Sequence, residues 1–535
     1  FLYGDLLRIR ALYTRRSIEG IRNAPVITDK RILIILRVLT IMFPGANRID
    51  EKLFTMITVK LALLTGQYGN SRYSGIGYAC ACYLLFFVFN GYYSGNRLQK
   101  LTLELLEEEG RGYDKTIPYA LIGTFTYHLC NPFSDTLKVL ARSIQYAPAE
   151  NEYLYSNYAI VFSIITKYVM GEKLPQIGAY IRQNMSKKKR LENYLTRHMY
   201  DIYISQIAYL EEGYEDYRDR ADREKQSFHE TISLNYEMIR VHRLLIEGRI
   251  RDAFNLADRI EDRVWRHKGF VLNGHFAFYS ALSRMMVYHS LPTLEKRKNK
   301  RIIKRHIRWI KKCARFDNSS CKAMALLLET EYNFYIREKQ GTDKDHYRAM
   351  VFARQDQNIQ LEALANLLIS RHYTYNLKLS VFYAGEAARL FRQWGAKFIA
   401  DVIGKAAGAD VPVEAQSKDE KPVSTGDIRD ALTYINRINT MSHEQICREF
   451  IDLILQEHTV KRCALFFEQN DDMYVWYDRS ARQQWDIDNT ATSIKYMDNI
   501  PQTLIRYVSR TGEGATVDSR GRDSLFMTDP YLADQ

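Results

Sequence analysis

Apolar residues recur at the three- and four-residue spacing of an amphipathic helix along residues 1–406. The chain has 11 prolines among 535 residues, which suits long helices because proline removes a helix hydrogen bond and clashes with the preceding turn. The clearest helical segments start at Leu6, Leu7 and Ile9, continue with Leu33, Ile34, Leu36 and Leu39, and then cover residues 50–67 and 74–109. We therefore expect a mainly α-helical fold.

Glycine-containing turns separate these segments. The stretch Asn90-Gly91-Tyr92-Tyr93-Ser94-Gly95 supplies glycine where a helix must stop and reverse, and Gly171, Gly213 and Gly248 are expected to do the same. Paired helices joined by such turns predict an α-solenoid of tetratricopeptide type, in which each helical pair buries its face on its neighbours. The spacing is not a strict 34 residues, so the repeats are degenerate.

The apolar run of residues 78–89 is shorter than the roughly 18 to 20 residues that a membrane span requires, and it predicts a core helix. No signal peptide is recognisable. Seven cysteines are scattered without metal-ligand spacing, which favours reduced buried thiols and a cytoplasmic location. The first and last residues are expected to be cuts from a longer protein.

The pattern changes after residue 406. Residues 407–425 are poor in large apolar side chains and predict an exposed linker. The elements expected after it are a helix with Ile428, Leu432 and Ile435 on one face, a helix from a Ser442–Gln445 capping box to residue 458, strands over 462–468 and 473–477, a helix over 492–510 and a strand over 514–517. This order predicts the opening half of an α/β domain around an antiparallel sheet.

Three stretches carry a resemblance to a known family. They are Gln67-Tyr68-Gly69-Asn70-Ser71 with the helix from Tyr78 and Gly91–Gly95; residues 361–366 followed by Ala387, Ala388, Phe391 and Trp394-Gly395-Ala396; and residues 500–508 with Arg510-Thr511 and Asp529-Pro530-Tyr531. In this order they resemble the region between the AAA-type ATPase and the output domain of large bacterial multidomain signalling proteins. Those proteins combine a serine/threonine kinase-like domain, an ATPase, a helical region, a GAF domain and a histidine kinase or other output.

The resemblance implies a solenoid over 1–406, a linker over 407–425, and a signalling helix with the N-terminal part of a GAF-like domain over 426–535. A GAF domain of this family would continue after Tyr531 with two strands and a helix, so the domain is expected to be incomplete here. The ATPase and kinase-like domains of such a protein are expected to precede this chain. The function so implied is that of a non-catalytic regulatory and protein-interaction segment, which relays between the ATPase and an output such as a two-component kinase.

The expected partners are a protein or peptide on the solenoid and the neighbouring domains of the same polypeptide. A homodimer through the 428–435 helix is a further expectation. Neither a cofactor nor a membrane span is expected.

No catalytic constellation is recognisable in the sequence. The stretch Gly110–Thr116 lacks the glycine before Lys115 that a phosphate-binding loop requires, and it does not follow a strand. Kinase catalytic motifs are missing too. The histidines His128, His198, His242, His267, His275, His289 and His372 occur singly. We therefore expect structural imidazoles, no metal site and no enzymatic activity.

The strongest charge feature is the segment 295–315, where Lys or Arg fills eleven positions. On a helix, Ile303, Ile307, Ile310 and Ala314 would form an apolar stripe with the basic residues elsewhere. One interpretation is another solenoid helix with a basic solvent face. The alternative, which the net charge of +13 invites, is a nucleic-acid-associated regulator.

Aromatic residues of the C-terminal region could line a ligand pocket. The candidates in the GAF-like domain are Phe467, Tyr474, Trp476 and Tyr507. Strand alternation puts half of a strand's side chains on each face, so an ordinary core is the other interpretation.

Overall fold

A computed structural model of the chain describes residues 2–15, 18–110, 112–188, 194–214, 230–266, 269–339, 343–373, 377–406, 462–469, 472–480, 492–497 and 499–511. The chain divides into two compact units, Phe1–Asp410 and Val411–Gln535. Several predicted features lie outside the described residues: the linker 407–425, the 428–435 helix, the 442–458 helix, the 514–517 strand, the Asp529-Pro530-Tyr531 motif and His267.

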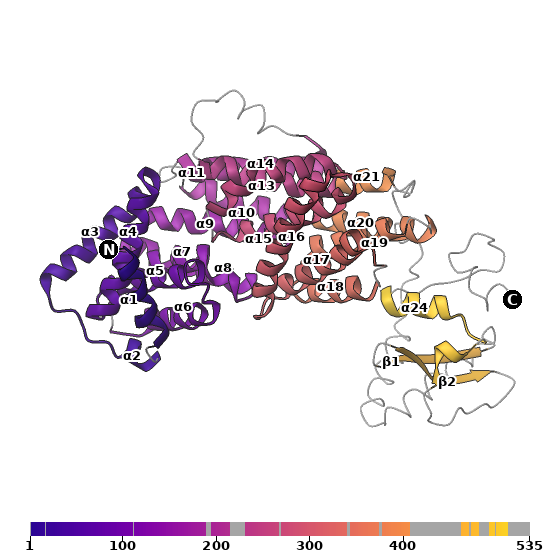
Figure 1. Cartoon of the computed structure of the whole chain (residues 1–535), viewed down its shortest axis with the longest axis horizontal. Coiled ribbons are helices and arrows are strands. Elements are labelled where there is room, and N and C mark those ends of the chain that lie inside the picture. Colours follow the sequence, from indigo (N-terminus) through magenta and orange to yellow (C-terminus); the bar gives the residue numbers. More distant parts are fainter. Residues whose placement is uncertain are drawn as a thin grey trace, which may run out of the picture. The chain divides into compact units, whose positions relative to one another are not determined.

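The described residues are mainly helical, as the spacing of apolar residues predicts (Figure 1). The helices of the first unit are α1 (Leu2–Arg15), α2 (Ile18–Arg22), α3 (Lys30–Ile49), α4 (Glu51–Tyr68), α5 (Ser74–Phe87), α6 (Tyr92–Glu107), α7 (Thr116–Phe125), α8 (Phe133–Glu150), α9 (Tyr153–Val169), α10 (Leu174–Lys188), α11 (Tyr194–Glu212), α13 (Glu230–Ile246), α14 (Ile250–Arg266), α15 (Val271–Met286), α16 (Thr293–Ala314), α17 (Ser319–Arg337), α18 (Asp343–Gln355), α19 (Ile359–His372), α20 (Leu377–Trp394) and α21 (Lys397–Ala406), with 3-10 turns η1 (Tyr127–Leu129) and η2 (Tyr288–Ser290). Among the described helices, none combines the length and the apolar character that crossing a bilayer requires.

Many helices that follow one another in the chain pack together, such as α4 with α5, α8 with α9 and α19 with α20, and some alternate helices also meet. Contacts run from α5 to α7, from α7 to α9, from α9 to α15, and on through α17 to α19, so these helices form a continuous inner row. Helices α5, α9, α15 and α19 are buried along most of their length. This arrangement is consistent with a helical solenoid, and it makes α5 the core helix that its apolar run predicts.

The turns use glycine as predicted in three places. Gly171, Gly213 and Gly248 have φ values of +75°, +78° and +88°, which residues with a Cβ rarely adopt. The turn between α5 and α6 differs from the prediction, because Asn90 takes the left-handed conformation (φ +53°). Gly95 lies inside α6, where a Cβ would come within 2.7 Å of the Phe86 ring. Its role is therefore close packing of the helical pair.

Two capping asparagines connect parts of the chain that are far apart in sequence. The Asn318 side chain accepts a hydrogen bond from the Cys321 amide at the start of α17, and its Nδ2 donates to the Asn131 carbonyl at 3.0 Å. Asn358 caps α19 in the same way and donates to the Val169 carbonyl at 3.2 Å. Each N-cap thus also satisfies a carbonyl near α8 or at the end of α9.

The described part of the second unit contains a β-hairpin and one helix. Strand β1 (Arg462–Gln469) pairs antiparallel with β2 (Asp472–Ser480), as predicted, and β2 pairs with the short β3 (Thr492–Ser493). The predicted helix over 492–510 is wrong in its first part. Residues 492–496 form β3 and the 3-10 turn η3 (Ile494–Tyr496), and α24 (Gln502–Thr511) begins only after Pro501. Proline disfavours helical backbone in the residue before it and starts helices well.

Candidate functional site

Helix α3 carries the most extended exposed apolar surface of the first unit's N-terminal part. One of its sides is buried through Leu36 and Phe43, and the Phe43 ring lies 4.8 Å from that of Phe54 in α4. The opposite side exposes large apolar residues: Ile34, Ile35, Val38, Ile41 and Met42. Ile34 and Ile41 are 61% and 67% exposed. Large exposed apolar patches on soluble proteins mark interaction sites, so this side of α3 is a candidate binding surface.

The charges on α3 have one sign. Its sequence contains Lys30, Arg31, Arg37 and Arg48 and no acidic residue. The exposed residues Lys30, Arg31 and Arg37 flank the apolar side at its N-terminal half. We call the set Ile34, Ile35, Val38, Ile41 and Met42 with these flanking cations the α3 surface.

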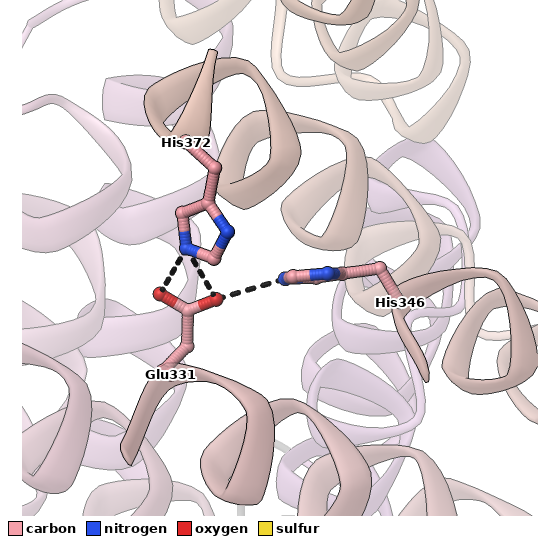
Figure 2. Close-up of side chains that lie close together, drawn as sticks. All are labelled: Glu331, His346 and His372. Carbon is pink, nitrogen blue, oxygen red and sulfur yellow. Dashed lines mark hydrogen bonds and ion pairs between the residues drawn. The ribbon is translucent and has the colours of Figure 1, made fainter. Parts of the chain in front are cut away.

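A second feature is a buried carboxylate with two imidazoles. Glu331 lies on α17, His346 in the first turns of α18, and His372 is the last residue of α19. The three helices pack against one another, so the side chains converge from three directions (Figure 2). Glu331 and His346 are buried, and His372 is 10% exposed.

The polar contacts in this cluster all go to the carboxylate. Glu331 Oε1 lies 2.8 Å from His346 Nε2, and Glu331 Oε2 lies 3.2 Å from His372 Nε2 (Figure 2). Burial alone would raise the pKa of Glu331, but the hydrogen bonds and charges of His346 and His372 outweigh it and lower that pKa to about 2. The carboxylate is therefore ionised at neutral pH.

Aromatic neighbours fix the His372 ring. It stacks on Phe334 with ring centroids 3.8 Å apart and an interplanar angle of 15°. The His346 ring meets His372 at 78° with centroids 5.0 Å apart. His346 Nδ1 is buried without a hydrogen-bond partner, so its Nε2 contact with Glu331 is the polar interaction that orients this imidazole.

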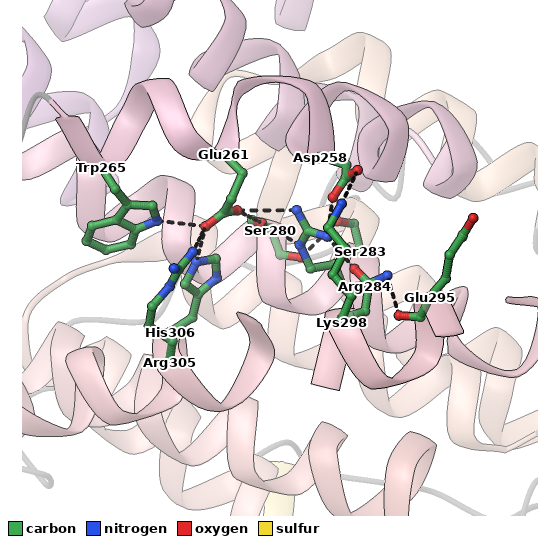
Figure 3. A network of polar contacts seen from close by, with 11 residues as sticks. Asp258, Glu261, Trp265, Ser280, Ser283, Arg284, Glu295, Lys298, Arg305 and His306 are labelled. Carbon is green, nitrogen blue, oxygen red and sulfur yellow. Dashed lines mark hydrogen bonds and ion pairs between the residues drawn. The ribbon is translucent and has the colours of Figure 1, made fainter. Parts of the chain in front are cut away.

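A second buried carboxylate, Glu261 on α14, has a different set of partners (Figure 3). Its oxygens accept hydrogen bonds from the following donors: His306 Nε2 at 2.8 Å, Arg305 Nη2 at 2.7 Å, Trp265 Nε1 at 2.7 Å, Arg284 Nη2 at 3.3 Å and Ser280 Oγ at 3.3 Å. Arg284 is fully buried and also pairs with Asp258 at 2.9 Å. Burial would raise the pKa of Glu261, but His306 and Arg284 outweigh it and keep that pKa well below its usual range.

Within the described part of the chain, the buried histidines His128, His242 and His275 have no acidic partner. Burial lowers the pKa of His128 and of His275 to about 3, and it also lowers the pKa of His242. His242 Nδ1 lies 2.8 Å from the Tyr168 hydroxyl. These imidazoles are neutral core groups, which agrees with the structural role expected for them.

The basic segment forms α16, with Ile303 and Ile310 buried as predicted. Part of its charge is neutralised by neighbouring helices: Lys298 pairs with Asp258 at 3.1 Å, Arg305 with Glu261, and Lys311 with Glu329. Other basic residues on α16 are exposed and follow one side of the helix at alternating spacings of four and three: Arg297, Arg301, Lys304 and Arg308.

Two of the proposed pocket residues of the second unit meet. Phe467 and Tyr474 are opposite one another on β1 and β2, and their rings stack with centroids 5.6 Å apart. The register shifts between Leu465 and Phe466, which makes Trp476 the extra residue of a β-bulge. Tyr507 is half-buried on α24. The apolar core contains Val475, Ile494, Ile500 and Ile505, with Phe466 packed against it.

The cysteines of the described part are free. Cys80, Cys82, Cys130, Cys313 and Cys321 are buried and Cys463 is half-buried. Burial raises the pKa of Cys80, so its thiol stays protonated at neutral pH. Cys447 lies outside the described residues.

The sequence pattern did not predict that Glu331, His346 and His372 lie close together. His372 was interpreted as a single structural histidine, and no pair of histidines occurs on one helical face. The ligand-bearing residues belong to three different helices, so only the order of these helices in the solenoid could have suggested that they meet.

Comparison of the chain with protein-family models, with curated proteins and with solved structures gives no match.

Proposed function

We propose that this chain is a non-catalytic regulatory segment of a bacterial signal-transduction protein. In this proposal an α-solenoid of tetratricopeptide type binds a protein partner and relays its binding toward a GAF-like domain and an output domain. The observation that carries the binding role is the α3 surface, where Ile34 and Ile41 are more than half exposed on a helix whose other side is packed in the core.

The chemistry of the α3 surface selects the partner. Large apolar side chains at positions 34, 38 and 41 follow one side of a helix, which suits the apolar face of another amphipathic helix. Arg31 pairs with the N-cap Asp29 at 3.6 Å, whereas Lys30 and Arg37 are exposed cations and α3 itself has no acidic residue. The complementary partner therefore carries acidic residues beside its apolar stripe. We therefore propose an acidic amphipathic helix as the ligand.

The relay part of the proposal depends on continuity of packing. The inner row of helices from α5 to α19 offers an uninterrupted path through the first unit. The capping links from Asn318 and Asn358 add hydrogen bonds between early and late helices. A rigid stack of this kind transmits a displacement better than helices that are joined only in sequence.

A peptide-binding experiment tests the proposed surface. The probe is a synthetic helical peptide with leucine at heptad a and d positions and glutamate beside them, and the control peptide has lysine in place of glutamate. We expect the acidic peptide to bind, by fluorescence anisotropy, and Ile41→Asp to weaken binding at least about tenfold, which corresponds to roughly 1.4 kcal/mol. The matched control is Leu294→Asp, because Leu294 is 78% exposed on α16 and should leave binding unchanged.

Two outcomes would overturn this assignment. Equal binding of both peptides, or equal binding by the wild type and Ile41→Asp, would show that the α3 surface does not select an acidic helix. Binding of anionic lipid vesicles that depends on Ile41, without peptide binding, would assign the surface to a membrane instead.

The family arrangement has its own test in the coding sequence that flanks this chain. We expect an AAA-type ATPase before it and the remaining GAF strands and output domain after it. Flanking sequence without either element would reject the proposed signalling architecture, and it would leave the peptide-binding experiment unaffected. A GAF pocket around Phe467, Tyr474, Trp476 and Tyr507 also stays a proposal, to be tested by ligand screening on a chain that includes those strands.

The exposed basic side of α16 favours a second candidate function, binding of nucleic acid. Arg297, Arg301, Lys304 and Arg308 could contact successive phosphates, and such binding weakens steeply with salt. The double variant Lys304→Glu/Arg308→Glu should then abolish binding of a short DNA duplex at low salt. If the wild type does not bind duplex DNA or RNA at low salt, this second function is wrong.

A further inference from the structure

We infer that Glu331, His346 and His372 bind one divalent transition-metal ion, with zinc as the best match. This site goes beyond the proposed interaction function and does not depend on it. Among the described residues these three form a group whose ligand atoms all lie within 4.8 Å of one another. Two imidazole nitrogens and a carboxylate oxygen are ligands that zinc commonly takes in proteins.

The distances from the Glu331 carboxylate to the two imidazoles are close to those of a metal centre. Zinc–ligand bonds of about 2.0–2.1 Å in a tetrahedral arrangement place neighbouring ligand atoms about 3.3 Å apart. Here Glu331 Oε1 lies 2.8 Å from His346 Nε2 and 3.1 Å from His372 Nε2. Outward movement of these side chains by a few tenths of an ångström would make room for the ion.

The Glu331 carboxylate is bonded to imidazoles and not to a permanent cation, so a metal ion could balance its negative charge. Its hydrogen bonds within the described part of the chain go to the two imidazoles (Figure 2). Neither an arginine nor a lysine is bonded to this carboxylate, in contrast to Glu261, which accepts from Arg284 and Arg305. Both imidazoles turn the same type of nitrogen, Nε2, toward Glu331, so both can present a lone pair to one ion.

The surroundings favour a fixed site with one open position. The stack on Phe334 holds the His372 ring, and that ring lies at the partly exposed edge of the cluster. A water molecule could therefore reach the fourth position. Tyr335 is an unsuitable fourth ligand, because burial, followed by the charge of Glu331, raises its pKa to about 12.

One nearby charge opposes the ion. Arg371, next to His372 on α19, interacts electrostatically with Glu331, and burial lowers the pKa of this guanidinium. It is not bonded to the carboxylate; its Nη1 contacts Met286 Sδ at 3.3 Å. Arginine stays cationic in proteins, so Arg371 weakens the site without occupying it.

Metal binding would connect three helices through one centre. Glu331, His346 and His372 come from α17, α18 and α19, so the ion would replace the two imidazole–carboxylate hydrogen bonds by three metal–ligand bonds. In the bound state each Nε2 gives its lone pair to the ion and the ring keeps one proton, on Nδ1. A ring that carries two protons must release one to solvent, and binding therefore weakens as the pH falls.

The experiment uses the full chain, purified without metal-affinity chromatography, stripped with a chelator and titrated with Zn²⁺ and Co²⁺. We expect one zinc per chain by elemental analysis and the visible absorption bands of tetrahedral Co²⁺. His372→Gln should lower the affinity at least about 100-fold, since even loss of an outer-shell partner costs 10- to 100-fold. His306→Gln is the matched control, because it removes the other imidazole–carboxylate contact and should retain the metal.

Circular dichroism shows whether each variant folds. If His372→Gln does not fold, Glu331→Gln replaces it, and the Co²⁺ spectrum of the wild type decides without any variant. A wild-type chain that gives no tetrahedral Co²⁺ bands, or a folded His372→Gln chain that binds zinc as tightly as the wild type, would overturn the inference.

Discussion

Two buried carboxylates of the first unit, Glu261 and Glu331, each bond to a histidine at 2.8 Å, yet their surroundings differ. Glu261 accepts from two arginines, an indole, a hydroxyl and an imidazole (Figure 3). Glu331 accepts from two imidazoles (Figure 2). The first carboxylate is bonded to two guanidinium groups, whereas the second is bonded to imidazoles.

The same imidazole–carboxylate hydrogen bond can therefore belong to a structural network or to a candidate metal site, depending on the other partners of the carboxylate. The Glu261 oxygens accept hydrogen bonds from five donors. A metal ion could bind these oxygens only after several of the hydrogen bonds had broken. Around Glu331 an ion would displace two imidazole–carboxylate hydrogen bonds. We therefore expect the Glu261 network to act as a structural joint and the Glu331 cluster to respond to ligands and pH.

The largest effect is expected from Arg284→Met. Arg284 is fully buried between Asp258 and Glu261, and its removal leaves them only the half-exposed cations Lys298 and Arg305. Breaking a buried ion pair on one side costs about 3–5 kcal/mol. Urea denaturation at pH 7 should show a loss of this size in the free energy of unfolding, and a loss below about 1 kcal/mol would contradict the view of Arg284 as the structural cation.

Acid should reveal the contribution of Glu331. Its pKa is about 2 in the folded chain and 4.5 in the reference state, so its stabilising effect is complete above pH 4.5 and is lost as the pH falls toward 2. The loss should be about 3 kcal/mol. We expect unfolding measurements with chelator present to show this component in the wild type and not in Glu331→Gln. Parallel pH profiles for the two chains would contradict it.

Stabilisation by zinc should depend on the Glu331 cluster and not on the Glu261 network. At a free concentration about 100 times its dissociation constant, a ligand that binds only the folded chain adds about 2.7 kcal/mol to the free energy of unfolding. The wild type and His306→Gln should both gain this amount, and His372→Gln, with at least about 100-fold weaker affinity, should gain no more than about 0.4 kcal/mol. An equal gain in all three chains would assign the zinc to a different site.

The smallest effect is expected from Arg305→Gln. The Arg305 side chain is 48% exposed, and Glu261 keeps its bonds to Arg284, His306 and Trp265 without it. Partly exposed ion pairs contribute less than about 1 kcal/mol. Denaturation should detect a change no larger than this, and a loss comparable to that of Arg284→Met would show that the two arginines act as one unit.

The sequence predicted most of the helical architecture. Helix α4 at Glu51–Tyr68 and helix α16 at Thr293–Ala314 match their expected segments closely, since amphipathic spacing is a local feature. The helix expected to begin at residue 492 was wrong, because the pairing of β3 with β2 overrides local helical spacing there.

The two candidate sites could not be predicted from local patterns. Helix α3 is apolar on both sides, so its sequence alone does not tell which side packs against α4 and which stays exposed. Glu331, His346 and His372 are separated by 15 and 26 positions, and their meeting depends on how three helices stack. The three- and four-residue spacing of apolar residues predicts each helix, but it does not determine which helices contact one another.

The capping links of Asn318 and Asn358 also bear on how the first unit comes apart. A stack of repeats that contact only their neighbours can fray from one end, repeat by repeat. Here the starts of α17 and α19 hold carbonyls of the chain near α8 and at the end of α9, 187 and 189 positions earlier. Opening of the late helices must therefore expose the early ones, and proteases should find few stable, partly opened forms to cut.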